Sequence, residues 1–138
     1  MSVLHSKFET EMQVRPDDID MNQHVHNSRY FDYVLAARYD QMERCYKMPM
    51  GEFIKLGFGW VVKVAFVEYK RPLGLGDKFT VKTWIQEVVK DGVKVQFEIL
   101  KAGTGKLSCC GYFDYTMINL QSGRAESIPG WIVEKYSI

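Results

Sequence analysis

Five segments of the chain have the hydrophobic patterns of β-strands. The first is residues 8–15 (FETEMQVR), in which apolar and polar side chains alternate until Pro16 ends the pattern. Residues 59–70 are apolar at nearly every position, so both faces of that strand need to be covered. The other predicted strands are residues 79–89, 93–99 and 107–118.

One long segment has the pattern of a helix. Residues 30–46 contain no Gly or Pro, and the polar residues before them offer Asn27 or Ser28 as the N-cap. Between residues 30 and 39 the segment is apolar on almost every side. We therefore expect other elements to enclose this helix.

Shorter signals mark the connections. Residues 52–57 predict a helical turn that ends at Gly57, and residues 130–136 predict a last short helix after Pro129. The pair Asp91-Gly92 stands between two alternating segments and predicts a tight β-hairpin.

This order of elements predicts an α+β fold. Short turns join antiparallel neighbours, so we expect one curved antiparallel sheet wrapped around one long central helix, in a single domain over residues 1–138. One helix cannot cover both faces of such a sheet, and the remaining apolar surface predicts a symmetric dimer. The alternative is an ordinary strand that the last helix partly covers.

The composition is that of a soluble globular protein, with 46% hydrophobic and 25% charged residues. A formal net charge of +1 gives no reason to expect a nucleic-acid partner. Cys45, Cys109 and Cys110 show no zinc or disulfide spacing, which favours a reducing compartment. Without a secretory signal pattern or a membrane-spanning apolar run, a cytoplasmic location is expected.

Residues 17–30 (DDIDMNQHVHNSRY) concentrate carboxylates, imidazoles and amides directly before the apolar helix. The first N–H groups of a helix lack partners within it and favour negative charge, so they can stabilise the oxyanion formed from a substrate carbonyl. Asp20 stands a few residues upstream, where a carboxylate can activate water as a general base or attack as a nucleophile. These are the minimal parts for hydrolysing an activated acyl compound.

Other catalytic signatures are absent from the sequence, which contains no GxSxG elbow, P-loop, GxGxxG motif after a strand or HExxH motif. No cofactor is expected. His24 and His26 could bind a metal together with Asp20, but no further ligand is apparent, so no metal is expected. Asp17 and Asp18 are expected to be solvated loop carboxylates.

The same segment resembles the hotdog-fold acyl thioesterases. Residues 20–25 (DMNQHV), followed by Asn27 and Tyr30, are similar to the Asp-x-Asn-x-His-Val-Asn-Asn motif of the acyl-ACP thioesterases and to the 4-hydroxybenzoyl-CoA thioesterase-like branch. The order of elements over the whole chain is also similar. The resemblance implies a homodimer with its sites at the interface, often paired into a homotetramer, and acyl-CoA or acyl-ACP as the substrate.

Carried over residue by residue, the resemblance implies that Asp20 is the catalytic carboxylate and that the backbone N–H of Asn27 polarises the thioester carbonyl. Asn22 and His24 match the amide and imidazole of the motif, which would orient Asp20 or the attacking water. The alternatives are a turn-forming role for Asp20 and purely structural roles for Asn22 and His24.

Three positions depart from the family pattern. His26 stands where the motif has Asn, and Asn22-Gln23 replaces the Gly that is common in the acyl-CoA branch. Leu35 falls where many relatives have Glu, although Arg38 matches the family. These departures leave the acyl chain and its carrier open.

Four residues are candidates for substrate binding. Tyr30 and Trp60 could line an acyl tunnel, with ordinary core packing as the alternative. Lys70 and Arg71, at the end of the long strand, could bind the phosphates of coenzyme A, with a solvated strand end as the alternative.

Thioester hydrolysis is the favoured interpretation, and two others stay open. A hotdog enoyl-thioester hydratase uses an Asp-x-Asn-x-x-His-like set, but here His24 follows Asp20 by four positions without the Pro of that motif. A non-catalytic protein that binds acyl thioesters would have no need of an intact Asp20.

Overall fold

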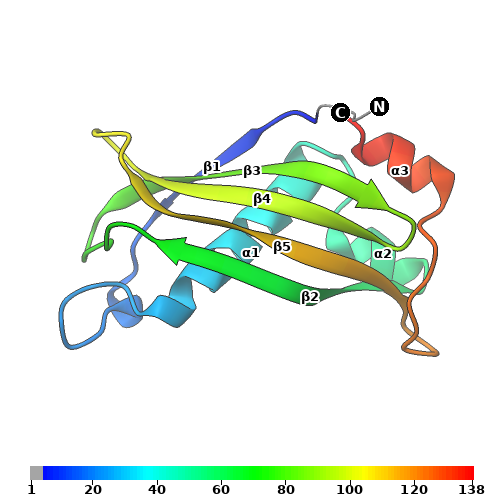
Figure 1. Cartoon of the computed structure of the whole chain (residues 1–138), viewed down its shortest axis with the longest axis horizontal. Helices are drawn as coiled ribbons and strands as arrows, with labels where there is room; N and C mark the ends of the chain where they lie inside the picture. Colours follow the sequence, from blue (N-terminus) through cyan, green and yellow to red (C-terminus); the bar gives the residue numbers. More distant parts are fainter. Residues whose placement is uncertain (1–4) are drawn as a thin grey trace.

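Five antiparallel strands form one sheet in the order β1-β3-β4-β5-β2, in a computed structural model that describes residues 5–138 (Figure 1). The predicted α+β class and antiparallel sheet are confirmed. The strands are β1 (Phe8–Gln13), β2 (Phe58–Tyr69), β3 (Lys78–Val89), β4 (Gly92–Lys101) and β5 (Leu107–Asn119).

The predicted strands agree with the observed ones to within two residues at each end. The first strand ends at Gln13, and β4 continues to Lys101 because that residue still pairs with Phe79 of β3. The predicted hairpin is confirmed, with Val89 opposite Gly92. A Cβ atom on Gly92 would lie 2.3 Å from the carbonyl oxygen of Tyr115, so the close approach of β5 requires the glycine.

The long helix α1 (Asn27–Arg44) crosses one face of the sheet diagonally (Figure 1). It begins three residues earlier than predicted, and its N-cap is His26, whose Nδ1 accepts a hydrogen bond from the N–H of Ser28 at 3.2 Å. The prediction of Asn27 or Ser28 as the N-cap was wrong, because an imidazole nitrogen fills the acceptor role that a shorter polar side chain usually takes.

The sheet covers only one side of α1. The side chains that face it are buried, whereas Asp32, Ala36 and Tyr39 are exposed, the last of them by 55%. The expected enclosure of the helix is therefore not achieved within one chain, because the sheet lies on one side of it only. An apolar side chain left in solvent in this way is available to a further partner.

Two short helices close one end of the sheet, α2 (Met50–Lys55) and α3 (Gly130–Tyr136). Both were predicted, and the observed α2 begins two residues earlier than the predicted turn. A 3₁₀ turn, η1 (Pro16–Asp18), follows the first strand and was not predicted. None of the helices in the described part of the chain has the length and apolarity that a membrane crossing requires.

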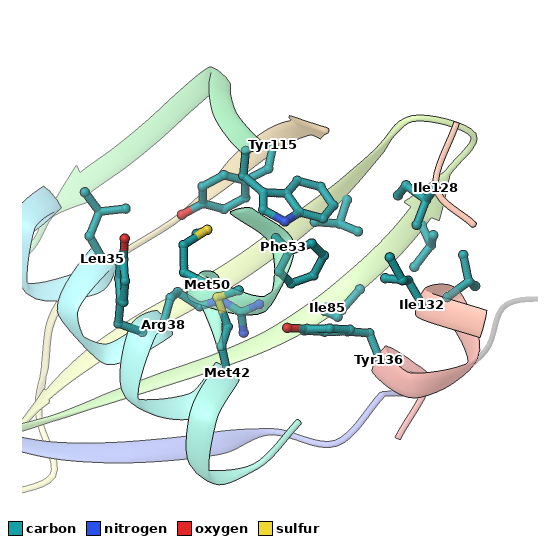
Figure 2. Close-up of a pocket in the computed structure, with 15 residues that line it drawn as sticks. Leu35, Arg38, Met42, Met50, Phe53, Ile85, Tyr115, Ile128, Ile132 and Tyr136 are labelled. Atoms are coloured by element: carbon teal, nitrogen blue, oxygen red, sulfur yellow. The ribbon is translucent and has the colours of Figure 1, made fainter. Parts of the chain in front are cut away.

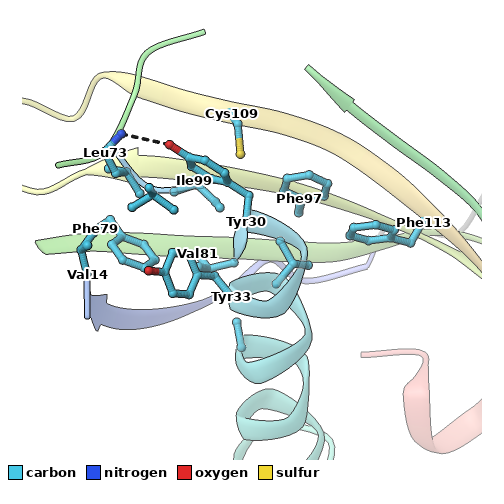
Figure 3. Packing of buried hydrophobic residues seen from close by; sticks show 13 residues of the cluster. Val14, Tyr30, Tyr33, Leu73, Phe79, Val81, Phe97, Ile99, Cys109 and Phe113 are labelled. Atoms are coloured by element: carbon cyan, nitrogen blue, oxygen red, sulfur yellow. Dashed lines mark hydrogen bonds between the residues drawn. The ribbon is translucent and has the colours of Figure 1, made fainter. Parts of the chain in front are cut away.

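The core consists of two clusters along α1. One cluster includes Met42, Tyr46, Phe53 and Tyr136 and surrounds a cavity at the α2 and α3 end (Figure 2). The other lies between the first turns of α1 and the sheet, where Tyr30, Tyr33 and Phe79 pack together (Figure 3). The loop that precedes α1 lies against this second cluster.

Candidate active site

Residues 19–25 form a tight loop in front of α1. Ile19 pairs with Val25 as in an antiparallel hairpin, and the N–H of Asp20 donates to the carbonyl of His24 at 2.8 Å. Gln23 closes the turn at φ 62°, in the left-handed region that favours glycine. The turn therefore has a backbone conformation typical of glycine at a position that carries a longer side chain.

The carboxylate of Asp20 holds this loop together with one of its two oxygens. Oδ1 accepts hydrogen bonds from the backbone N–H groups of Asn22 at 2.8 Å and His24 at 3.3 Å. Oδ2 has no hydrogen-bond partner within residues 5–138. Asp20 is half-buried, so one oxygen is fixed in place and the other is available.

Backbone pairing fixes the loop to the rest of the molecule. The N–H of Val25 donates to the carbonyl of Leu73 at 2.8 Å, and His24 forms an antiparallel bridge with Gly74. The N–H of His26 donates to the carbonyl of Asp18 at 2.9 Å. The segment between β2 and β3 therefore supports the loop from one side.

Asp18 supports the loop from below. It is 6% exposed, and its Oδ2 accepts a hydrogen bond from the hydroxyl of Tyr33 at 2.6 Å. Arg29 forms an ion pair with its other oxygen at 3.4 Å. The expectation of a solvated carboxylate was wrong for Asp18, because the 3₁₀ turn directs its side chain inward. The same expectation fits Asp17, which is exposed and paired with Arg15.

The first turn of α1 presents an unused donor. Asn27 is the first helical residue, and its N–H makes no hydrogen bond to the described residues. Its carbonyl accepts a hydrogen bond from the hydroxyl of Tyr69 at the end of β2, at 3.0 Å. Asn22 and His24 are exposed on the adjoining loop. The fold thus brings all four candidate catalytic residues to one end of α1.

Lys70 and Arg71 lie at this same end of the molecule, directly after Tyr69. Both are exposed. Lys70 forms an ion pair with Glu68 at 2.7 Å, which raises the pKa of its ammonium group, and Arg71 donates to the carbonyl of Leu107 at 3.2 Å. The two cations are held on the surface next to the start of α1.

Tyr30 and Trp60 are not brought together. Tyr30 is buried, and its hydroxyl accepts a hydrogen bond from the N–H of Leu73 at 3.0 Å (Figure 3), so it ties the core to the segment behind the loop. Trp60 lies near the start of β2 and lines the cavity. It precedes Tyr69 by nine positions on the same strand, a distance of about 30 Å along the strand.

The cavity has a volume of about 70 Å³ and an almost entirely apolar wall. Methionine and aromatic side chains share this wall with aliphatic ones; among them are Met42, Met50, Phe53 and Tyr136 (Figure 2). Trp60 also lines it. Long flexible methionines allow such a space to widen around an apolar guest. Sequence reasoning found Trp60 but missed Met50 and Arg38, since helix α2 had to be placed against α1 before its side chains could be assigned to a cavity.

Metal ligands are not gathered at the loop. Within residues 5–138, no three side chains of His, Cys, Asp or Glu lie close enough together to bind an ion. His24 is exposed, whereas the imidazole of His26 is engaged as the N-cap with Ser28. The chemistry of the loop therefore depends on its carboxylate and on the helix start.

Comparisons with known proteins agree with this geometry. The sequence profile of the thioesterase-like superfamily matches residues 14–136. The long-chain acyl-CoA thioesterase FadM of Escherichia coli is 27% identical over 129 residues, which cover 93% of this chain and 96% of FadM.

Solved structures share the fold. A hypothetical protein from Aquifex aeolicus is 25% identical, with a TM-score of 0.86 over 94% of this chain and 98% of its own. A DHNA-CoA thioesterase from Staphylococcus aureus is 22% identical, with a TM-score of 0.87 over 95% and 89% of the two chains. The predicted resemblance in fold is confirmed.

Proposed function

The chain belongs to the thioesterase-like superfamily, and we propose on this premise that it hydrolyses an acyl thioester to a free acid and a thiol. Acyl-CoA is the first choice of substrate, because FadM, similar over nearly the whole of both chains, is named a long-chain acyl-CoA thioesterase. Acyl-ACP is the second choice, on the similarity of residues 20–27 to the acyl-ACP thioesterase motif.

The single observation that supports this proposal most is the Oδ2 atom of Asp20, which has no hydrogen-bond partner among the described residues. Because Oδ1 is held by two backbone N–H groups, the carboxylate has a defined orientation and still keeps one oxygen for chemistry. That oxygen acts on the thioester carbonyl either by taking a proton from water or by direct attack. In the first route the hydroxide formed from water adds to the carbonyl and the thiolate leaves, which gives the free acid directly. In the second route the carboxylate displaces the thiolate and forms a mixed anhydride with Asp20, which water then hydrolyses to the free acid.

The start of α1 supplies the second part of the mechanism. The tetrahedral intermediate carries a negative charge on the former carbonyl oxygen. The N–H of Asn27, at the positive end of an 18-residue helix, is a donor with no partner in the described part of the chain. Asn22 and His24 are exposed on the loop that holds Asp20, where they orient the attacking water. Lys70 and Arg71 offer positive charge to the phosphates of the carrier.

The proposed active unit is a dimer. The edge strand β2 is 12 residues long, and four of its large apolar side chains, Val61, Val62, Val64 and Phe66, are exposed. A long apolar edge strand pairs readily with a second copy. If two β2 strands pair antiparallel about a twofold axis near the middle of the strand, the start of β2 in one chain lies beside the end of β2 in the other. The partner's cavity then adjoins Asn27, and a pair of dimers gives the predicted tetramer.

A thiol-release assay over a series of acyl-CoA and acyl-ACP substrates tests the proposal. Thiol release that is lost in both Asp20→Ala and Asp20→Asn supports hydrolysis. Hydration of crotonyl-CoA without thiol release would support the hydratase instead. Saturable binding of acyl-CoA without any turnover would support a non-catalytic binding protein.

A further inference from the structure

Arg38 is a buried cation that has no counter-charge among the residues that the structure describes. It is 8% exposed, and its Nη1 donates one hydrogen bond, to the hydroxyl oxygen of Thr83 at 3.3 Å. No carboxylate in the described part of the chain forms an ion pair with it. Asp40, two positions later, is instead held by Thr10 and Arg44.

This leaves most of the binding capacity of the guanidinium unused. The group carries five N–H donors and no acceptor, and it stays protonated at any ordinary pH. The ring of Tyr46, 5.3 Å from Cζ, gives a cation–π contact but accepts no strong hydrogen bond. Burying a charge that has only one neutral hydrogen bond destabilises the fold unless an anion binds to the charge.

Two further donors face the same cavity. The hydroxyl of Tyr115 and the indole N–H of Trp60 are buried and have no hydrogen-bond partner among residues 5–138, and both residues line the cavity wall. Figure 2 shows the Arg38 side chain reaching from α1 into the middle of the pocket. The hydroxyl of Tyr136, on the same wall, is not one of these donors, because it already donates to the carbonyl of Met48 at 2.7 Å. An otherwise apolar wall therefore offers a concentration of unused donors.

We propose that this cavity binds an acyl chain whose far end carries a carboxylate, and that Arg38 selects such substrates by pairing with that group. The inference rests on the proposed thioester hydrolysis and names its substrate class, the CoA monothioesters of dicarboxylic acids. The methylene chain matches the apolar wall, whereas the terminal carboxylate accepts two parallel hydrogen bonds from the planar guanidinium. A methyl-ended chain would leave the charge of Arg38 unpaired.

Matched pairs of substrates test the inference. Each CoA monothioester of a dicarboxylic acid, from adipoyl to hexadecanedioyl, is compared with the fatty acyl-CoA of equal length. The wild type is expected to favour the carboxylate member of at least one pair by about 10- to 100-fold in kcat/KM. Arg38→Leu should abolish or reverse this preference, Arg38→Lys should keep part of it, and Arg124→Leu, an exposed arginine, should leave it unchanged.

A binding measurement separates this inference from the proposed function. Isothermal titration calorimetry compares monomethyl decanedioate with methyl decanoate, in the wild type and in Arg38→Leu. Tighter binding of the carboxylate in the wild type alone supports the inference even if no thioester is hydrolysed. The inference would be overturned if the wild type and Arg38→Leu both hydrolyse fatty acyl-CoA and show the same ratio of kcat/KM between carboxylate-ended and methyl-ended substrates. That result would leave the proposed function standing. Arg38→Leu is expected to fold, since it replaces an unpaired buried charge with an apolar side chain.

Discussion

Tyr33 in the second turn of α1 donates a hydrogen bond of 2.6 Å to Asp18 in the 3₁₀ turn before the loop. Both residues are buried, and burial together with this carboxylate raises the pKa of the Tyr33 hydroxyl, so it remains a donor at neutral pH. The bond joins the helix to the chain two residues before Asp20. The position of the candidate catalytic carboxylate therefore depends on a contact within the core.

Tyr33→Phe should uncouple the loop from the helix. The substitution keeps the ring in the core but leaves Oδ2 of Asp18 buried without its partner, at a cost of about 1–3 kcal/mol in the free energy of unfolding. We expect kcat to fall while KM changes little, since Tyr33 positions Asp20 and does not contact substrate. Asp18→Asn keeps an acceptor for the same hydroxyl and should retain more of kcat. Equal loss in kcat and in substrate affinity would contradict this role.

Asp20→Asn should separate chemistry from loop structure. The amide oxygen of Asn can still accept the two backbone N–H bonds that Oδ1 accepts now, so the loop should keep its conformation. The loss of a base or nucleophile should lower kcat/KM for acyl-CoA by roughly 10²- to 10⁴-fold. Asp17→Asn, an exposed carboxylate in the same segment, is the matched control and should retain full activity. Wild-type rates for Asp20→Asn would remove Asp20 from the mechanism.

Gln23→Gly should stabilise the protein. Gln23 has a φ of 62°, and a side chain in this region costs about 1 kcal/mol that glycine avoids. Glycine also gains entropy in the unfolded chain, so the net increase in the free energy of unfolding should be at most about 1 kcal/mol. Urea denaturation measures the free energy of unfolding. Lys47→Gly, at φ 61°, is expected to stabilise the protein in the same way, whereas Gln23→Val is expected to destabilise it. A destabilised Gln23→Gly variant would contradict the argument.

Alkaline pH should destabilise the fold through Cys109. Burial raises the pKa of its thiol from 9.0 to about 12, so between these values the folded state keeps a proton that the unfolded state releases. The stabilisation is complete below about pH 9 and is lost as pH rises toward 12, by about 1.4 kcal/mol per pH unit from this group. Urea denaturation from about pH 8 to 11 should show a smaller slope in Cys109→Ala. Parallel slopes would exclude this thiol as the cause.

Periodic patterns in the sequence predicted the sheet, the long helix and both short helices, because these elements bury regular sets of apolar side chains. Within β5, Cys109 is buried and Cys110 only partly so, because successive strand residues point to opposite faces of the sheet. The fate of Asp18 could not be predicted. Its burial depends on a 3₁₀ turn and on Tyr33, a partner 15 residues away, and no local pattern encodes such a contact.

The candidate site also combines residues that a local sequence pattern identifies with residues that only the folded structure brings together. Residues 20–27 are adjacent in sequence, so their motif identified them without a structure. The cavity is built from the three helices and from strands β2 to β5, which meet only in three dimensions. Arg38 could not be recognised as a cation without an ion-pair partner among the described residues until its surroundings were known.

A substitution in the edge strand should separate the proposed dimer into single chains. Val64 is exposed near the middle of β2, where two copies would pair about the twofold axis, and an aspartate there opposes its own symmetry mate. Sedimentation at micromolar concentration should give the mass of two or four chains for the wild type and of one chain for Val64→Asp. Because the proposed site takes its cavity from the partner, thiol release should fall together with the mass.

Val89→Asp is the matched control, since Val89 is a similarly exposed valine at the end of β3, and it should change neither the mass nor the rate of thiol release. A wild type that sediments as one chain and still hydrolyses acyl-CoA would show that each chain completes its own site.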